Sequence, residues 1–104
     1  MKILVTGATG HLGSLVVEKL LESVAPGNIA VSVRDPARAE RLRRRGVDVR
    51  RGDFDRPETL KDAFAGADRM LMISTTGDNE TRIRQYLNAV AAAREAGVGF
   101  IAYT

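Results

Sequence analysis

Residues 3–13 decide the predicted fold, and they read Ile3-Leu4-Val5-Thr6-Gly7-Ala8-Thr9-Gly10-His11-Leu12-Gly13. The apolar run at 3–6 is typical of a buried parallel strand. Apolar residues then recur at helical spacing on one expected buried face, which comprises Leu12, Val16, Val17, Leu20, Leu21 and Val24. The three glycines therefore lie in the turn that joins a strand to a helix.

Each glycine of this turn has a physical role in a phosphate-binding loop. Gly7 permits the tight turn, Gly10 lets a diphosphate approach the backbone, and Gly13 lets the helix pack closely on the sheet. The free amides at the start of the helix attract anions. The pattern indicates a dinucleotide-binding unit, although glycines chosen only for packing are an alternative. A nucleoside-triphosphate P-loop is disfavoured, because no Gly-Lys-Ser/Thr sequence follows the glycines.

Strands and helices alternate along the whole sequence. We predict further strands at 29–33, 47–51, 70–73 and 98–103. We predict that residues 26–28 end the first helix and that further helices span 35–46, 57–65 and 80–96. The buried faces of the last two helices are expected to comprise Leu60, Phe64, Ile83, Leu87 and Val90. This alternation predicts one α/β domain over 1–104, a Rossmann-type doubly wound parallel sheet of order 3-2-1-4-5 with helices on both faces.

The end of the second predicted strand indicates which dinucleotide binds. NAD-binding domains usually place an acidic residue here, whereas this chain has Val33-Arg34. A guanidinium group suits a 2′-phosphate, so we expect NADP(H) rather than NAD(H). Arg38 follows one helical turn later, and Asp35 before Pro36 fits a helix cap. The alternative is that both arginines are solvated surface charges.

Composition excludes several other classes of protein. The 104 residues carry a net charge of +3, contain no cysteine, which excludes disulfides and cysteine-based zinc sites, and have one histidine, so no histidine cluster for a metal is expected. No apolar run could span a bilayer and no signal peptide is evident, so we expect a cytoplasmic protein. A basic run is interpreted as a solvated helix face rather than a nucleic-acid surface, because no aromatic residues interleave with it. It consists of Arg41, Arg43, Arg44, Arg45, Arg50 and Arg51.

Several segments together resemble the NmrA-like atypical short-chain dehydrogenase/reductase family, and within it the type 2 NAD(P)H:quinone oxidoreductases. These segments are Thr6-Gly7-Ala8-Thr9-Gly10-His11-Leu12-Gly13, Val33-Arg34-Asp35-Pro36, Gly52-Asp53-Phe54, Gly97-Val98 and Phe100-Ile101-Ala102-Tyr103-Thr104. The resemblance covers the whole chain, and the glycine motif is its most specific part.

The resemblance implies where each part of the cofactor binds. The glycine loop would hold the diphosphate, the arginine after the second strand the 2′-phosphate, the aspartate after the third strand the adenine, and the loop after the fourth strand the nicotinamide ribose. By position these roles fall on Gly7, Thr9, Gly10, His11, Leu12, Arg34, Arg38, Asp53, Phe54 and Ser74, with Thr75 as a weaker addition.

Simpler interpretations of the same residues stay open. Asp53 and Asp55 could only order a turn, and Ser74 and Thr75 could only cap the following helix. His11 is more typical of a surface residue at a helix start than of a catalytic base, so we expect at most a backbone contact from it.

The chain departs from a complete reductase in two ways. Short-chain dehydrogenases usually carry a Tyr-x-x-x-Lys pair, but Val90 follows Tyr86 at that spacing and Tyr103 precedes the last residue, so no catalytic residue is assigned. The resemblance also implies a longer protein with a substrate lobe. The sequence therefore predicts the cofactor part of a quinone reductase, with a nicotinamide dinucleotide and a quinone as partners.

Three further expectations accompany this prediction. A non-catalytic NADP(H) sensor is the alternative function, and a structural fragment without ligand affinity is a weaker one. The last predicted strand would be an unpaired edge, so we expect a homo-oligomer formed through it.

Overall fold

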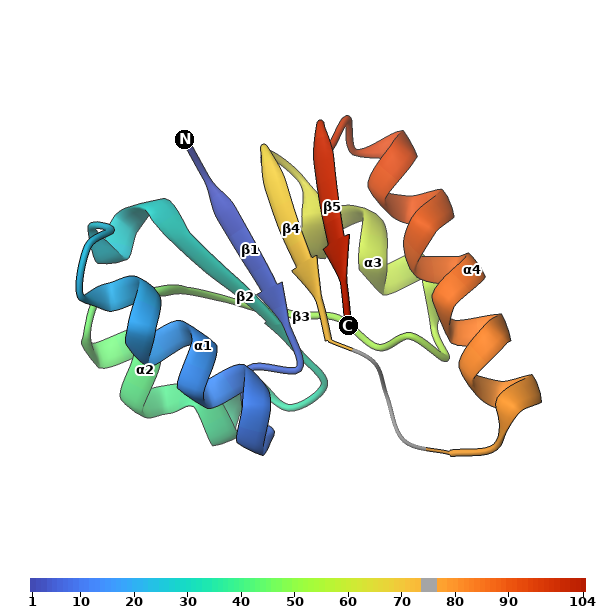
Figure 1. Cartoon of the computed structure of the whole chain (residues 1–104), viewed down its shortest axis with the longest axis horizontal. Coiled ribbons are helices and arrows are strands. Elements are labelled where there is room, and N and C mark those ends of the chain that lie inside the picture. The colour runs from blue at the N-terminus through green and yellow to red at the C-terminus, as the bar shows by residue number, and fades with distance from the viewer. Residues whose placement is uncertain (74–76) are drawn as a thin grey trace.

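The structure, a computed structural model, describes residues 1–73 and 77–104. Its strands are β1 (Ile3–Thr6), β2 (Ile29–Val33), β3 (Asp48–Arg51), β4 (Arg69–Met72) and β5 (Phe100–Tyr103). Its α-helices are α1 (His11–Leu21), α2 (Glu40–Arg44), α3 (Pro57–Phe64) and α4 (Asn79–Glu95), and two 3-10 helices are η1 (Pro26–Asn28) and η2 (Pro36–Ala39). All five strands form one parallel sheet in the order β3-β2-β1-β4-β5, as the sequence predicted (Figure 1).

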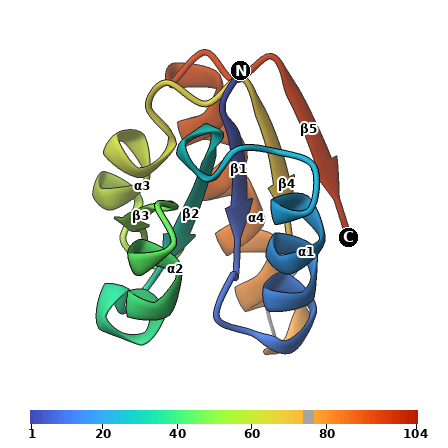
Figure 2. The same cartoon turned by 90° about the vertical axis from the view of Figure 1, so that its left-hand side faces the viewer.

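Two apolar layers cover the two faces of the sheet. Neighbouring residues of β1 point to opposite layers: Leu4 packs under α3 and α4, and Val5 packs under α1 and α2. Figure 2 shows α1 and α2 in front of the strands and α4 behind them. Because both faces are covered, ligands can approach β1 and β2 only at the ends of the strands.

The first two helical segments end earlier than predicted. The helix α1 ends at Leu21, and residues 26–28 form the separate turn η1. Ala25 precedes a proline and is extended, with φ −59° and ψ 137°, so the helix could not continue to this point. The segment predicted at 35–46 divides at Ala39 into η2 and α2, and this division buries both Ala39 and Leu42 against the sheet.

Two predicted buried faces are partly wrong. Ile83 and Leu87 on α4 are 59% and 60% exposed, and the buried residues of this helix are the alanines Ala89, Ala92 and Ala93. Gln85 and Asn88 bond to the turn after β3, so Ile83 and Leu87 lie on the face of α4 that is turned away from the fold. Figure 1 shows the first turns of α4 beyond the carboxyl ends of the strands. Leu12 is also exposed, because it begins α1 at that same end of the sheet.

The basic run is not one helix face. Arg41, Arg43 and Arg44 belong to α2, whereas Arg50 and Arg51 belong to β3. The Arg50 side chain is only 21% exposed and bonds to neighbouring groups of the fold. The interpretation as a solvated helix face therefore fails for these two residues.

Candidate functional site

The glycine loop connects β1 to α1 and has little room for side chains. Gly7 has a φ of 63°, a left-handed conformation that favours glycine. A Cβ atom on Gly13 would lie 2.0 Å from the carbonyl oxygen of Gly7, so the first turn of α1 can approach the loop only without a side chain there. Gly10 is different, because its conformation is extended and a Cβ would meet only the Gly7 carbonyl oxygen at 3.3 Å. The fold therefore requires Gly13 more strictly than Gly10.

The amino-terminal end of α1 is open to an anion. Gly10 is the N-cap residue, and no side chain among the described residues caps the helix. The first turn also holds no acidic residue. The first amides of a helix have no intrahelical partners and carry partial positive charge. The backbone at residues 11–13 therefore offers unoccupied donors toward the space in front of β1.

This space is a cleft of about 760 Å³ at the carboxyl ends of β1, β2 and β3. Ten of the twelve predicted site residues line it: Gly7, Thr9, Gly10, His11, Leu12, Gly13, Arg34, Arg38, Asp53 and Phe54. The remaining two, Ser74 and Thr75, lie outside the described residues. The structure thus brings together residues that span more than 40 positions of the sequence, in a volume typical of small-molecule and cofactor sites.

One wall of the cleft carries two unpaired guanidinium groups. Arg34 follows β2 directly and Arg38 lies in η2, and both side chains are exposed. Within residues 1–73 and 77–104, neither arginine has an ion-pair partner. Asp35 between them is the N-cap of η2, and its carboxylate accepts a hydrogen bond from the Ala37 amide at 3.1 Å, as predicted. The wall therefore presents net positive charge.

The turn after β3 forms another wall of the cleft. The Asp53 carboxylate accepts a hydrogen bond from the Asp55 amide at 2.9 Å, and the Asp53 amide donates to the Thr59 hydroxyl at 2.9 Å. Asp53 therefore orders a turn, as one interpretation proposed, and it also lines the cleft. Phe54 lies beside it and packs partly against the core under α3 and α4.

Side chains of α4 hold this turn in place. Arg84 and Gln85 each donate to the Asp55 carboxylate, with nitrogen–oxygen distances of 3.2 Å. Asn88, one turn further along the helix, donates to the Phe54 carbonyl oxygen at 2.9 Å. The hydrogen bonds from Gln85 and Arg84, with the charge of Arg34 acting in the same direction, hold the pKa of Asp55 below its ordinary value. Asp55 is therefore an ionised group of the cleft.

Seven further residues line the cleft although the sequence did not predict them as site residues, namely Ser32, Val33, Asp35, Gly52, Asp55, Ile73 and Gln85. Gly52 had a recognisable signal, because it ends β3 as Gly7 ends β1. A Cβ atom there would lie 2.2 Å from the Ser32 hydroxyl oxygen, so the two strands could not approach with a side chain at this position. Gln85 had no such signal, since its place depends on how α4 packs.

Other site classes find no support in the described part of the chain. Residues 1–73 and 77–104 contain no group of three His, Cys, Asp or Glu side chains able to hold a metal ion. In the same residues, no helix is both long enough and apolar enough to cross a membrane. His11 is exposed at the start of α1, where its carbonyl oxygen accepts a hydrogen bond from the Ser14 hydroxyl.

This chain is similar to several known proteins. The model of the NmrA-like family matches residues 1–103. Quinone oxidoreductase 2 of Escherichia coli is 41% identical over 98% of this chain and 35% of its own length. Among solved structures, the Citrobacter sp. triphenylmethane reductase complexed with NADP(H) has a TM-score of 0.98 and 48% identity, covering 100% of this chain and 37% of that one. The NADPH complex of the Escherichia coli NADPH-dependent quinone oxidoreductase has a TM-score of 0.92 and 40% identity, covering 97% and 35%.

The chain therefore spans about a third of the length of the relatives it matches. The matched third of these relatives corresponds to nearly all of this chain. The similarity therefore includes the whole five-stranded sheet and the described walls of the cleft.

Proposed function

Because the chain belongs to the NmrA-like family, we propose that it is the NADP(H)-binding part of an NADPH-dependent quinone oxidoreductase. One observation carries this proposal: the end of α1, which no described side chain caps, lines the same cleft as Arg34 and Arg38, which have no ion-pair partner within residues 1–73 and 77–104. A dinucleotide with an additional phosphate carries its negative charge at two separate places, and the cleft offers positive charge at two separate places.

Three parts of the cofactor have groups among the described residues that suit them. The backbone at Gly10 and the open amides of α1 suit the diphosphate, since the absence of a Cβ on Gly10 leaves the backbone accessible. Arg34 and Arg38 suit the 2′-phosphate, and the turn at Asp53 and Phe54 suits the adenine. The proposed contacts of Ser74 and Thr75 with the nicotinamide ribose fall on residues that the structure does not describe.

The chemistry of the proposed reaction belongs mainly to the cofactor. Bound NADPH supplies a hydride for an acceptor such as a quinone, and the protein positions the nicotinamide and the acceptor. The described residues of this chain orient the dinucleotide from its adenine end. No residue here is assigned a proton-transfer role, so the acceptor site is expected in the remaining part of the longer protein.

Titration calorimetry with NADPH and NADH tests the proposal on this chain. We expect NADPH to bind at least about tenfold more tightly than NADH, because only NADPH engages the guanidinium pair. Equal affinity would contradict the assignment of Arg34 and Arg38, and absence of binding by either nucleotide to the folded chain would contradict the proposal itself.

A quinone reductase assay on a longer version of the protein separates the enzyme from the alternative function. Turnover of NADPH with a simple quinone by the longer protein, but not by this chain, is the expected result. Tight NADPH binding without turnover in both would favour an NADP(H) sensor that regulates a partner.

We also propose that this chain, when isolated, associates through β5. Among the strands that the structure describes, β5 pairs with β4 alone, and its apolar residues Phe100 and Tyr103 are 61% and 50% exposed. Unpaired strand edges favour pairing with another chain. Light scattering over a range of concentrations should show a dimer, and a monomer at the highest concentration would contradict the proposal.

A further inference from the structure

The positive wall of the cleft faces a carboxylate that should oppose phosphate binding. Asp55 lines the cleft together with Arg34 and Arg38, and its pKa is lowered partly by the charge of Arg34. A 2′-phosphate held by Arg34 would therefore lie within the electrostatic reach of an ionised carboxylate. Like charges at short range weaken binding, especially where part of the solvent is displaced.

The structure shows how Asp55 is kept away from this conflict. Arg84 donates to one carboxylate oxygen of Asp55 at 3.2 Å, and Gln85 donates to both oxygens at 3.2 Å. The side chains of Asp55 and Arg84 are about equally exposed, at 46% and 58%. Within the described residues no ion pair joins Asp55 to Arg34, so the nearest positive charge to Asp55 comes from α4.

We propose that Arg84 is a specificity-determining residue that favours the 2′-phosphate of NADP(H) by neutralising Asp55 and holding it toward α4. This inference rests on the proposed NADP(H)-binding function. Arg84 itself lines no part of the cleft and acts through Asp55, whereas Arg34 and Arg38 would contact the phosphate.

Two physical effects follow if the charge of Arg84 is removed. The carboxylate of Asp55 would repel a 2′-phosphate without compensation, and with only the neutral Gln85 still holding it, it would compete for Arg34, which the phosphate needs. A ligand with a free 2′-hydroxyl would not suffer either effect, because a carboxylate can accept a hydrogen bond from that hydroxyl, as in NAD-binding domains. The change should therefore shift the choice between ligands rather than weaken all binding.

The test compares 2′,5′-ADP with 5′-ADP. These two probes differ only in the 2′-phosphate, and neither needs contacts to a nicotinamide. Calorimetry on Arg84→Met should show 2′,5′-ADP binding weakened by about fivefold, in line with the modest strength of an exposed ion pair. The affinity for 5′-ADP should change by less than about twofold. Adding Asp55→Asn to Arg84→Met should restore most of the lost affinity, because it removes the repelling charge.

Arg82→Met is the matched control, because it removes the same charge from the same helix, and within the described part of the chain Arg82 forms no ion pair with Asp55. It should alter the affinity for the two probes by similar, small factors. The selective effect of Arg84→Met should also shrink between about 50 mM and about 500 mM salt, since exposed charges are screened.

The outcomes separate this inference from the proposed function. If Arg84→Met weakens both probes equally, or neither, Arg84 is not a specificity determinant even though the cleft binds nucleotides. If the double variant does not recover, Asp55 is not the group through which Arg84 acts. If the unmodified chain binds neither probe, the proposed function itself fails.

Discussion

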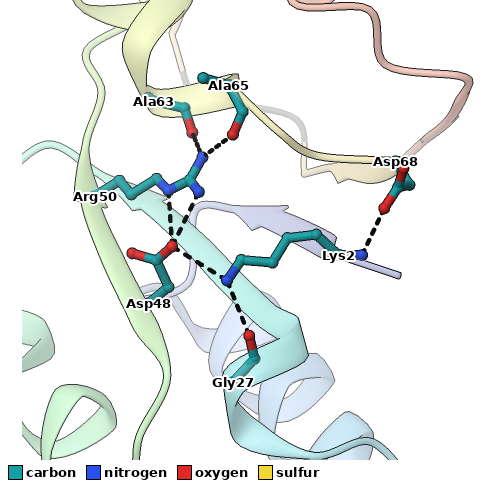
Figure 3. Close-up of polar contacts among 7 residues, drawn as sticks. All are labelled: Lys2, Gly27, Asp48, Arg50, Ala63, Ala65 and Asp68. Atoms are coloured by element: carbon teal, nitrogen blue, oxygen red, sulfur yellow. Dashed lines mark hydrogen bonds and ion pairs between the residues drawn. The ribbon is translucent and has the colours of Figure 1, made fainter.

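The two ends of the sheet use charged residues in opposite ways. At the amino-terminal end of the strands, Lys2, Asp48 and Arg50 form a connected set of ion pairs (Figure 3). At the carboxyl end, Arg34 and Arg38 have no ion-pair partner among the described residues. The first arrangement satisfies charges within the fold, and the second leaves positive charge available to a ligand.

We call the amino-terminal end of the strands the closed end and the carboxyl end, with the cleft, the open end. At the closed end, Arg50 also satisfies the last carbonyl groups of α3. Arg50 donates to the carbonyl oxygens of Ala63 and Ala65 at 2.9 and 2.6 Å, at the carboxyl end of α3, and to the Asp48 carboxylate at 2.9 Å. The last carbonyl groups of a helix have no intrahelical donors and carry partial negative charge. At the open end, by contrast, the amides that begin α1 have no side-chain partner among the described residues. One end of the sheet is thus built for stability and the other for binding.

The largest expected effect comes from Gly13, which belongs to the open end but serves the fold. Gly13→Ala should lower the free energy of unfolding by about 3 kcal/mol or more, because its Cβ would overlap the Gly7 carbonyl group. Thermal and denaturant unfolding measure this loss.

Gly10→Ala is the matched control for that substitution. It should lower the free energy of unfolding by about 1 kcal/mol at most, since alanine is only a poorer N-cap residue there. NADPH affinity should nevertheless fall strongly, because the Cβ would occupy the space proposed for the diphosphate. Equal stability losses in the two variants would contradict the distinction drawn between these glycines.

At the closed end, Arg50→Ala should lower the free energy of unfolding by about 2 kcal/mol, because it leaves the partly buried Ala63 carbonyl oxygen without its donor and leaves Asp48 with Lys2 as its remaining cationic partner. The affinity of the remaining folded protein for NADPH should not change. Arg51→Ala, at the neighbouring and exposed residue of β3, should cost less than about 0.5 kcal/mol. A loss of NADPH affinity in Arg50→Ala would show that the two ends are coupled.

The sequence predicted the sheet because local patterns suffice for it. The run Ile3–Thr6, the glycines after it and the alternation of strands with helices fix the strand order once right-handed crossovers are assumed. Arg34 was placed at the cleft for the same reason, since a residue that directly follows a strand must lie at the strand's carboxyl end. Side chains at strand ends are therefore the part of a site that a sequence can predict.

The rest of the site depends on packing between distant segments. Ile83 and Leu87 were predicted to be buried because the periodicity of large apolar residues indicated one face of α4, whereas the helix packs through the face that carries Ala89, Ala92 and Ala93. Asp55 and Arg84 are 29 residues apart, so their ion pair depends on the position of α4. Arg50 was grouped with surface arginines, because nothing local distinguishes a charge that bonds to helix carbonyls from one in solvent.

At the open end, Arg34→Ala should weaken NADPH binding by about tenfold, the scale of a charge-assisted hydrogen bond to phosphate. The affinity for NADH and the melting temperature should remain near those of the unmodified protein, because Arg34 has no ion-pair partner among the described residues. The dependence of NADPH affinity on salt should also become weaker. A lower melting temperature without a change in NADPH preference would place Arg34 in the fold rather than in the site.

The smallest expected effect is on the loss of stability at acidic pH, and it distinguishes Asp48 at the closed end from Asp55 at the cleft. Burial opposes the ionisation of Asp48, but the hydrogen bonds and charges of Arg50 and Lys2 outweigh it and lower the pKa of Asp48. The unfolded chain therefore binds the proton more readily than the folded one. The stabilisation is complete above the ordinary aspartate pKa of about 4 and is lost as the pH falls through the lower folded value.

Asp48→Asn should make the free energy of unfolding less dependent on pH in that acidic range, as urea titrations at a series of pH values can measure. Asp55→Asn should act in the same direction, because its pKa is lowered as well. Asp55 is the more exposed carboxylate and its charged partner Arg84 is 58% exposed, so added salt should reduce its contribution more than that of Asp48. If salt reduces both contributions equally, the ion pairs at the closed end are no better shielded than those at the cleft, and burial does not separate the two ends.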